Sequence, residues 1–201
     1  MPIIFFDFDG VIVDTYDTSF GIFKHANETL TEEEFKKYFE GSGNENVFKA
    51  QKPRMSIASF FTSYRTRVLD LPVVPGIGQV LKELSLTHRI IIVSSTPANI
   101  IDEFLKLHSL SAYVSKVFGG GDRRNKVDKL LFCLEKHQCA PGASVYVTDT
   151  LGDVHEATEA GIQSIAVTWG YHDTVTLQQG NPLIIVSDPS EVVTAVNNYF
   201  V

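Results

Sequence analysis

Five short runs of Ile, Val and Phe constrain the fold of this 201-residue chain more than any other feature of its sequence. A strand that is covered on both faces has its apolar residues on consecutive positions, whereas a strand with one wet face alternates apolar and polar residues. The runs are of the first kind, and they predict a buried parallel sheet. They lie at residues 3–8, 90–93, 145–148, 162–168 and 183–186.

Segments with helical spacing separate the later runs. One begins after Asn125, which is placed to cap a helix N-terminus, and another is closed by Gly161. A third begins at Asp188 with the stretch DPSE, in which Pro189 takes the first helical position and Glu191 completes a capping box. Strands that alternate with helices imply right-handed crossovers, so the predicted fold class is α/β, with a doubly wound, Rossmann-like parallel sheet.

Residues 16–74 break this rhythm, because they contain no comparable Val/Ile run. Their apolar residues have helical spacing in three stretches, which predicts a small helical bundle inserted after the first strand. Pro72 and Pro75 mark the return to the core. The predicted domains are therefore a core of residues 1–15 and 75–201 and a helical insertion of residues 16–74. The helical stripes comprise Phe20, Phe23, Leu30, Phe35, Tyr38, Phe39, Ile57, Phe60, Phe61 and Tyr64.

Composition excludes several classes of protein. The net charge is −7, and the chain has no block of Lys and Arg of the kind that binds nucleic acid or anionic lipid. The N-terminal apolar run lacks a basic flank and is interrupted by Asp7 and Asp9, so we expect neither a signal peptide nor a membrane span. Cys133 and Cys139 are expected to be free thiols. Together these features favour a cytoplasmic protein.

Polar side chains follow three of the predicted strands. The carboxyl ends of parallel strands meet at one edge of a sheet, where ligands bind, so these side chains are expected to lie together. A lysine at the start of the next helix adds a cation at the same edge. The candidate site residues are Asp7 and Asp9 after the first run, Ser94 and Ser95 after the second, Asp149 after the third with Asp153 four residues on, and Lys126.

The pair Asp7 and Asp9 raises the question of what holds two neighbouring carboxylates together. Buried carboxylates repel each other, and a cation or a shared proton would relieve the repulsion. Two carboxylates with a hydroxyl, a lysine and further carboxylates make up a phosphoryl-transfer site, in which Mg²⁺ takes hard oxygen ligands. Gly10 lets the chain turn away from such a site without a crowding Cβ.

Each remaining candidate also has a plainer explanation. Asp149 and Asp153 can serve as helix-start acids that complement the macrodipole, and Ser94 and Ser95 can be ordinary loop hydroxyls. Lys126 competes with the nearby basic residues Arg123, Arg124 and Lys129, although its place after the N-cap-like Asn125 favours it.

Four motifs in this order resemble those of the haloacid dehalogenase (HAD) superfamily of phosphohydrolases. They are DFDGVIVDT at residues 7–15, IIIVSS at residues 90–95, Lys126, and VTDTLGD at residues 147–153. The stretch VTWGYHD at residues 167–173 is similar to phosphoglycolate-phosphatase-like members. The resemblance implies a HAD-type core, and it implies that the insertion is a small helical cap that closes over the site and selects the substrate.

The resemblance also implies a role for each candidate residue. Asp7 would be the nucleophile that forms an aspartyl-phosphate, and Asp9 would protonate the leaving group and then activate water. Ser94 and the Ser95 backbone would bind phosphoryl oxygens, and Lys126 would neutralise their charge. Mg²⁺ would be held by Asp7, the Asp9 carbonyl and Asp149, with Asp153 in support.

Two positions narrow the expected reaction. An acid at Asp9 favours an oxygen leaving group over a halide, because a halide needs no proton. The sugar phosphomutase branch has a histidine shortly after the Asp-Thr pair, whereas this chain has Ser19 at the comparable place, which favours hydrolysis. We therefore expect a Mg²⁺-dependent phosphatase acting on a small phosphorylated metabolite. The alternatives are a phosphomutase and a catalytically idle relative that binds or regulates.

Several properties are beyond the sequence. The six histidines have no metal-ligand spacing and are expected to be surface or satisfied loop residues. Trp169 and the arginines Arg54, Arg65 and Arg67 of the insertion are equally compatible with a pocket and with a structural or solvated role. The substrate, the cap residues that select it and the oligomeric state are not predicted.

Overall fold

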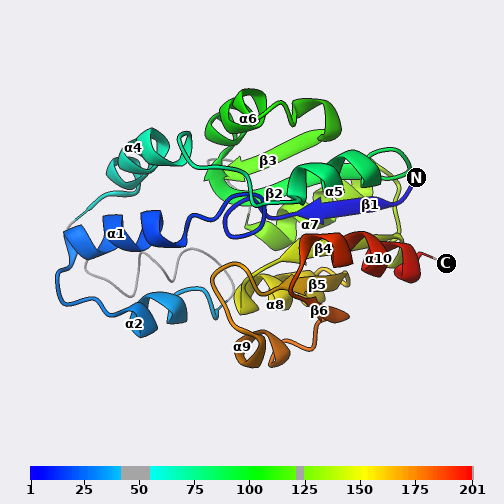
Figure 1. The fold of residues 1–201 in the computed structure, drawn as a ribbon. Coiled ribbons are helices and arrows are strands. Elements are labelled where there is room, and N and C mark those ends of the chain that lie inside the picture. Colours follow the sequence, from blue (N-terminus) through cyan, green and yellow to red (C-terminus); the bar gives the residue numbers. More distant parts are fainter. Residues whose placement is uncertain (42–54, 121–124, 201) are drawn as a thin grey trace.

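The computed structural model describes residues 1–41, 55–120 and 125–200. Its centre is a sheet in which every pair of neighbouring strands is parallel, in the order β3-β2-β1-β4-β5-β6 (Figure 1). This arrangement confirms the predicted α/β class. The strands are β1 (Ile3–Phe6), β2 (Arg89–Pro97), β3 (Lys116–Gly120), β4 (Ser144–Thr148), β5 (Gln163–Val167) and β6 (Ile184–Val186).

Helices cover both faces of the sheet. Side chains of α5, α6 and α10 pack with Ile4 and Phe6 of β1 on one face, and side chains of α7 and α8 pack with Ile3 and Phe5 on the other. Successive residues of a strand point to opposite faces, so a run of consecutive apolar residues buries side chains on both faces of the sheet. The helices are α1 (Tyr16–Ala26), α2 (Glu32–Lys37), α4 (Ile57–Val68), α5 (Ile77–Leu84), α6 (Ala98–Leu107), α7 (Lys126–Lys136), α8 (Leu151–Glu159), α9 (Thr174–Gln178) and α10 (Pro189–Tyr199).

All five predicted strands are present, and one strand was missed. Strand β3 is short and lies at the edge of the sheet, and its apolar pair Val117 and Phe118 runs directly into Gly119 and Gly120. Glycine is depleted in strands, so the pattern is too weak to recognise in sequence. Here the glycines permit close packing, because a Cβ on Gly120 would lie 2.0 Å from the Ser95 carbonyl oxygen.

The predicted helix ends are confirmed. The Asn125 side chain accepts a hydrogen bond from the Asp128 backbone N–H at the start of α7. Asp188 and Glu191 form the reciprocal capping box of α10, with Pro189 in its first turn. Gly161 follows α8 with a φ of 74°, a left-handed conformation that side chains disfavour.

Helices α1, α2 and α4 lie to one side of the sheet, beyond the carboxyl ends of its strands (Figure 1). Aromatic residues hold them together, as the 5.6 Å between the ring centroids of Phe23 and Phe35 and the 5.0 Å between those of Phe23 and Phe60 show. Ile57 departs from the predicted stripe, since it is 54% exposed at the first residue of α4. The division of the chain at residues 15 and 75 remains a prediction.

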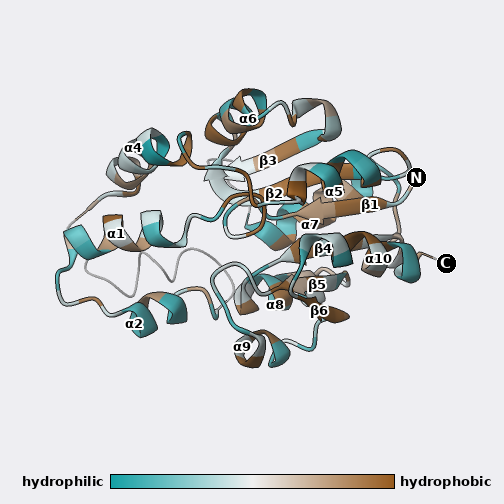
Figure 2. Ribbon diagram, viewed as in Figure 1, coloured by the Kyte–Doolittle hydropathy of each residue, from teal (hydrophilic) through white to brown (hydrophobic). Residues whose placement is uncertain are grey.

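Hydropathy follows this architecture, with brown strands in the interior and teal residues on the outer faces of the helices (Figure 2). Within the described residues, no helix combines the length and the apolar character needed to span a membrane. Cys133 is buried on α7 and Cys139 is half-buried, and both are free thiols as predicted.

Candidate active site

The carboxyl ends of β1, β2 and β4 and the first turns of α7 and α8 converge on one place. Every predicted site residue except Asp149 lines a single cavity there, and Asp149 is buried beside it. Gly10 has a φ of 71° at the turn after Asp9, and a Cβ at this position would overlap the Asp149 carboxylate. The tight turn expected at Gly10 is therefore present, and the missing side chain leaves space for the Asp149 carboxylate.

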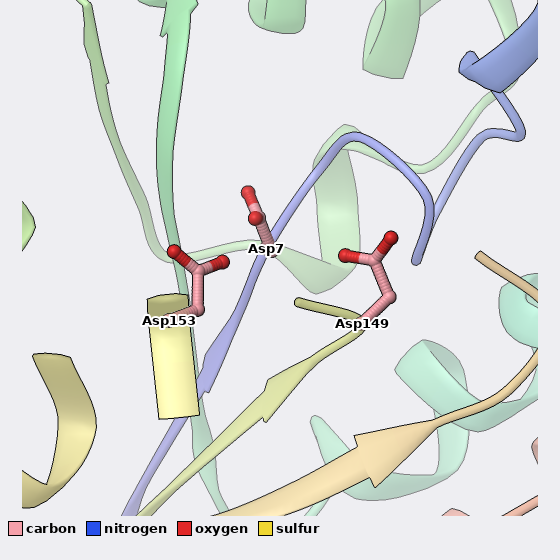
Figure 3. A group of neighbouring side chains, drawn as sticks. All are labelled: Asp7, Asp149 and Asp153. Carbon is pink, nitrogen blue, oxygen red and sulfur yellow. The ribbon is translucent and has the colours of Figure 1, made fainter. Parts of the chain in front are cut away.

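Three buried carboxylates form a cluster at the centre of the site (Figure 3). Asp7 follows β1, Asp149 follows β4, and Asp153 lies in the first turn of α8, where its backbone N–H is capped by Thr150. One oxygen of each carboxylate lies within 4.8 Å of the others. Asp153 was expected only to support the site, and the structure adds its carboxylate to the oxygens that a metal ion could use.

Lys126 is the cation that faces this cluster. Its Nζ lies 2.8 Å from Asp7 Oδ2 and 2.7 Å from both oxygens of Asp153. Burial acts to lower the pKa of Lys126, but the two carboxylates outweigh burial and hold that pKa well above its usual range. Burial likewise acts to raise the pKa of Asp153, but Lys126 holds it below its usual value. Burial raises the pKa of Asp7 well above its usual value, despite the same lysine.

Asp149 has a different environment. Its Oδ2 accepts a hydrogen bond of 2.7 Å from the Tyr171 backbone N–H, while its buried Oδ1 has no hydrogen-bond partner among the described residues. Burial raises the pKa of this carboxyl to about 8. A buried carboxylate oxygen without a partner is costly, and a hard divalent cation is a natural partner for it. The cluster therefore fits Mg²⁺.

Asp9 points into a set of hydroxyl groups and is half-buried. Its Oδ2 accepts hydrogen bonds from Thr96 Oγ1 at 2.7 Å and from Ser94 Oγ at 3.3 Å. Its Oδ1 accepts from Thr15 Oγ1 at 3.0 Å and from the hydroxyl of Tyr64 on α4. The two neighbouring aspartates are thus separated in chemistry, because Asp7 faces a lysine and carboxylates whereas Asp9 faces neutral donors.

Thr96 lines the cavity beside Ser94 and Ser95, in the polar stretch expected at the end of the second strand. Three residues at the site were not among the candidates: Thr15, Tyr64 and Tyr171. The hydroxyl oxygen of Tyr171 lies 3.1 Å from Thr15 Oγ1. The same hydroxyl donates a hydrogen bond of 3.0 Å to Ser19 Oγ. Thr15 and Tyr171 stand in motifs already recognised, at residues 7–15 and 167–173, so their positions held a usable signal. Tyr64 had none, because it lies in an ordinary amphipathic helix.

The structure distinguishes between the basic residues near the start of α7. Lys126 faces the carboxylates, while Lys129 donates a hydrogen bond of 2.9 Å to the Ser94 backbone carbonyl. Arg123 and Arg124 lie outside the described residues. Ser95 lines the cavity, as expected.

Two of the residues whose role was left open, Trp169 and Arg65, have structural contacts. Trp169 donates its indole N–H to the Val11 carbonyl at 3.3 Å and is not among the residues that line the cavity. Arg65 pairs with Glu103 on α6, Arg67 is exposed, and Arg54 lies outside the described residues.

One of the six histidines, His172, is buried at the site. Its Nδ1 accepts a hydrogen bond from the Leu151 backbone N–H at 2.9 Å, so its Nε2 carries the proton that it donates to the Lys36 carbonyl at 3.0 Å. It is a satisfied histidine, as predicted.

Comparison with known proteins identifies relatives of this chain. The family model described as haloacid dehalogenase-like hydrolase matches residues 4–167. A curated relative named phosphoglycolate phosphatase, from Synechococcus elongatus, is 28% identical over 206 residues, which cover 98% of this chain and 97% of the relative.

Two solved structures show the same fold. A haloacid dehalogenase-like hydrolase from Streptococcus pneumoniae has a TM-score of 0.80 at 23% identity, with 98% of each chain covered. A structure assigned as a β-phosphoglucomutase from Thermotoga maritima has a TM-score of 0.70 at 23% identity, with 98% of this chain and 99% of that chain covered.

Proposed function

Because the chain belongs to the haloacid dehalogenase-like hydrolase family, we propose that it is a phosphatase that cleaves the phosphomonoester of a small metabolite at the site around Asp7 and Asp9. The observation that carries the proposal is the different setting of these two aspartates. Asp7 contacts Lys126 and belongs to the carboxylate cluster. Among the described residues, the side-chain oxygens of Asp9 instead accept hydrogen bonds from hydroxyl groups. The name of the Synechococcus elongatus relative supports phosphate ester hydrolysis.

In the proposed reaction, an Asp7 oxygen attacks the phosphorus atom and the bond from phosphorus to the ester oxygen breaks. Asp9 gives its proton to the departing oxygen, so the alcohol leaves neutral. Asp9 then takes a proton from water as that water attacks the aspartyl-phosphate. This second step releases inorganic phosphate and restores both carboxyl groups. Lys126 and Ser94 would contact the phosphoryl oxygens and balance their charge.

A metal ion fits the proposal. Asp7, Asp149 and the Asp9 carbonyl would hold Mg²⁺, with Asp153 beside them, and the unpartnered Oδ1 of Asp149 supports this assignment. When bound, Mg²⁺ supplies positive charge that offsets the repulsion between the carboxylates and an incoming phosphate.

Two contacts support the proposal that residues 16–74 cover the site as a cap. Tyr64 of α4 reaches Asp9, and the Phe39 carbonyl after α2 accepts a hydrogen bond of 2.9 Å from the Gly152 backbone N–H at the start of α8. Both contacts join the helical segment to residues of the core at the cavity.

Ser19 favours hydrolysis over phosphoryl transfer between sugar positions. It stands where a phosphomutase of this superfamily would have a histidine, and its hydroxyl accepts a hydrogen bond from Tyr171. The fold itself does not separate the two reactions, since the Thermotoga maritima structure assigned as a mutase shares it.

The experiment measures Mg²⁺-dependent phosphate release from a panel of alkyl phosphates. We expect Asp7→Asn and Asp9→Asn each to lower kcat at least about 100-fold while the circular dichroism spectrum stays unchanged. Asp102→Asn, the same substitution at an exposed position of α6, is the matched control and should retain activity.

Two results would contradict the proposal. Formation of isomeric sugar phosphates in place of free phosphate would indicate a mutase. A folded wild-type protein that releases phosphate from no ester of the panel would favour the idle relative.

A further inference from the structure

The cavity over the two aspartates has an aromatic wall on the side away from the sheet. We use the term aromatic wall for the six rings of α1, of α4 and of the two residues after α2 that line the cavity. They are Phe23, Tyr38, Phe39, Phe60, Phe61 and Tyr64. Their rings pack on one another, with centroids 5.1 Å apart for Phe60 and Phe61 and 5.6 Å apart for Phe60 and Tyr64.

The wall adjoins the place where the bond would break. The hydroxyl of Tyr64 contacts Asp9, which protonates the leaving oxygen in the proposed reaction. The alcohol half of the substrate would therefore start beside the Tyr64 ring, with Phe60 and Phe61 next along α4. The cavity is partly open to solvent, so the rest of the alcohol would extend along these rings.

The described part of the cavity offers little to a second negative charge on the substrate. Among its described lining residues Lys126 alone has a basic side chain, and its Nζ is already bonded to Asp7 and Asp153. The other charged lining residues are acidic, and they include Glu156. A carboxylate on the alcohol would lose its hydration against rings and carboxylates, at a cost in binding.

Three basic residues of the described helices beside the cavity form contacts elsewhere. Lys24 of α1 donates a hydrogen bond of 2.6 Å to the Leu30 carbonyl. Lys37 of α2 pairs with Glu33, and Arg65 of α4 pairs with Glu103. These side chains are therefore engaged away from a substrate carboxylate.

We propose that this site prefers phosphomonoesters whose alcohol carries an aromatic or heteroaromatic ring. Small esters that carry a carboxylate, such as phosphoglycolate, are the poorer substrates. This inference rests on the proposed function. Aromatic side chains bind rings through offset-stacked and edge-to-face contacts in addition to the burial of apolar area. The preference differs from the name of the Synechococcus elongatus relative, so the two readings give opposite results.

The experiment compares kcat/KM for benzyl phosphate, ethyl phosphate and 2-phosphoglycolate. All three are esters of primary alcohols, so the intrinsic reactivity of the leaving group differs less than between alkyl and aryl phosphates. We expect kcat/KM for benzyl phosphate to exceed that of each other ester by about tenfold or more. Contacts between the benzyl ring and aromatic side chains account for a change of this size.

Substitutions in the aromatic wall test whether its rings cause the preference for benzyl phosphate. Phe61→Ala should lower the ratio of kcat/KM for benzyl phosphate to that for ethyl phosphate about tenfold, and Phe61→Leu, which retains apolar volume, should lower it less. Phe20→Ala is the matched control, because Phe20 belongs to the same helical segment, lies 5.4 Å from the Phe35 ring and does not line the cavity. It should leave the ratio unchanged.

Three outcomes would overturn the inference: phosphoglycolate as the better substrate, no preference for benzyl phosphate over ethyl phosphate, or an equal loss for both esters in Phe61→Ala. Calorimetric binding to the Asp7→Asn variant separates this failure from failure of the proposed function. If no ester is hydrolysed but benzyl phosphate still binds about tenfold more tightly than phosphoglycolate, the phosphatase proposal fails and the ring preference stands.

Discussion

Lys126 contacts two of the three clustered carboxylates, and it outweighs the effect of burial on the pKa at only one of them, Asp153. Both oxygens of Asp153 accept hydrogen bonds from Lys126, which lowers the pKa of Asp153. Burial raises the pKa of Asp149 to about 8. Near neutral pH, a metal ion and a proton therefore compete for Asp149.

The first prediction concerns the stability of the metal-free protein. The folded protein holds a proton on Asp149 up to about pH 8, whereas the unfolded chain loses that proton near its ordinary pKa of 3.8. The resulting stabilisation is complete below the unfolded pKa and is lost as pH rises through about 8. With a chelator present, we expect Asp149 to lower the free energy of unfolding from pH 5 to pH 8 by up to about 4 kcal/mol, at about 1.4 kcal/mol per pH unit.

Urea denaturation at several pH values measures this slope. Asp149→Asn should flatten it, although part should persist because the raised pKa of Asp7 acts in the same direction. Asp153 does not contribute in this window, since its lowered pKa affects stability only on the acid side of its ordinary value. Added Mg²⁺ should stabilise the wild type more at pH 8 than at pH 5. An identical slope in Asp149→Asn would show that another group carries the effect.

At the scale of elements, helix α4 contacts the core at two points. Arg65 forms a bidentate pair with Glu103 of α6, with N–O distances of 3.0 and 2.8 Å. One residue earlier, Tyr64 is buried and donates its hydroxyl to Asp9. The exposed ion pair contributes little stability, so the Tyr64 contact is the one with consequences for the site.

The second prediction concerns Tyr64→Phe. Asp9 would keep its bonds from Thr15, Ser94 and Thr96 but lose the donor from α4, so its carboxyl group would be held less precisely. We expect kcat to fall about tenfold with KM changed less than threefold, and stability to fall by about 1 kcal/mol.

Steady-state kinetics and urea denaturation test this prediction. Tyr199→Phe on α10, which removes a hydroxyl far from the cavity, should change neither kinetic constant. A rise in KM at unchanged kcat would assign the Tyr64 hydroxyl to substrate binding in place of positioning.

At the scale of the whole molecule, close backbone contact joins the helical segment to the core. Gly152 at the start of α8 donates to the Phe39 carbonyl, and a Cβ at Gly152 would lie 2.4 Å from the Gly41 carbonyl oxygen. Only a residue without a side chain allows this approach.

The third prediction follows from that contact. Gly152→Ala should push the residues after α2 away from α8, which opens the cavity and lowers kcat/KM about tenfold, while the sheet and its helices stay folded. Kinetics with limited proteolysis of the helical segment would detect the change. Gly21→Ala on α1 is the matched control, because a Cβ there meets nothing within 4 Å, and it should retain activity and gain up to about 1 kcal/mol of stability. Wild-type kinetics in Gly152→Ala would show that the contact has no role in turnover.

The sequence by itself determined the features that depend on neighbouring residues. Consecutive apolar residues predicted five strands, the caps at Asn125 and Asp188 placed two helix starts, and strand ends placed Asp7, Asp149 and Ser94 at one edge. These signals are local, because pleat, helix period and capping all act within a few residues.

Tertiary structure alone decided the rest. Thr96 and Tyr64 bond Asp9 from 87 and 55 residues away. The aromatic wall forms only because α1, α4 and the residues after α2 bring their rings together at the cavity. Strand β3 also depended on its neighbour, because β2 approaches it too closely for side chains at Gly119 and Gly120. No local pattern encodes which distant side chains meet, because that choice is made by the packing of the whole chain.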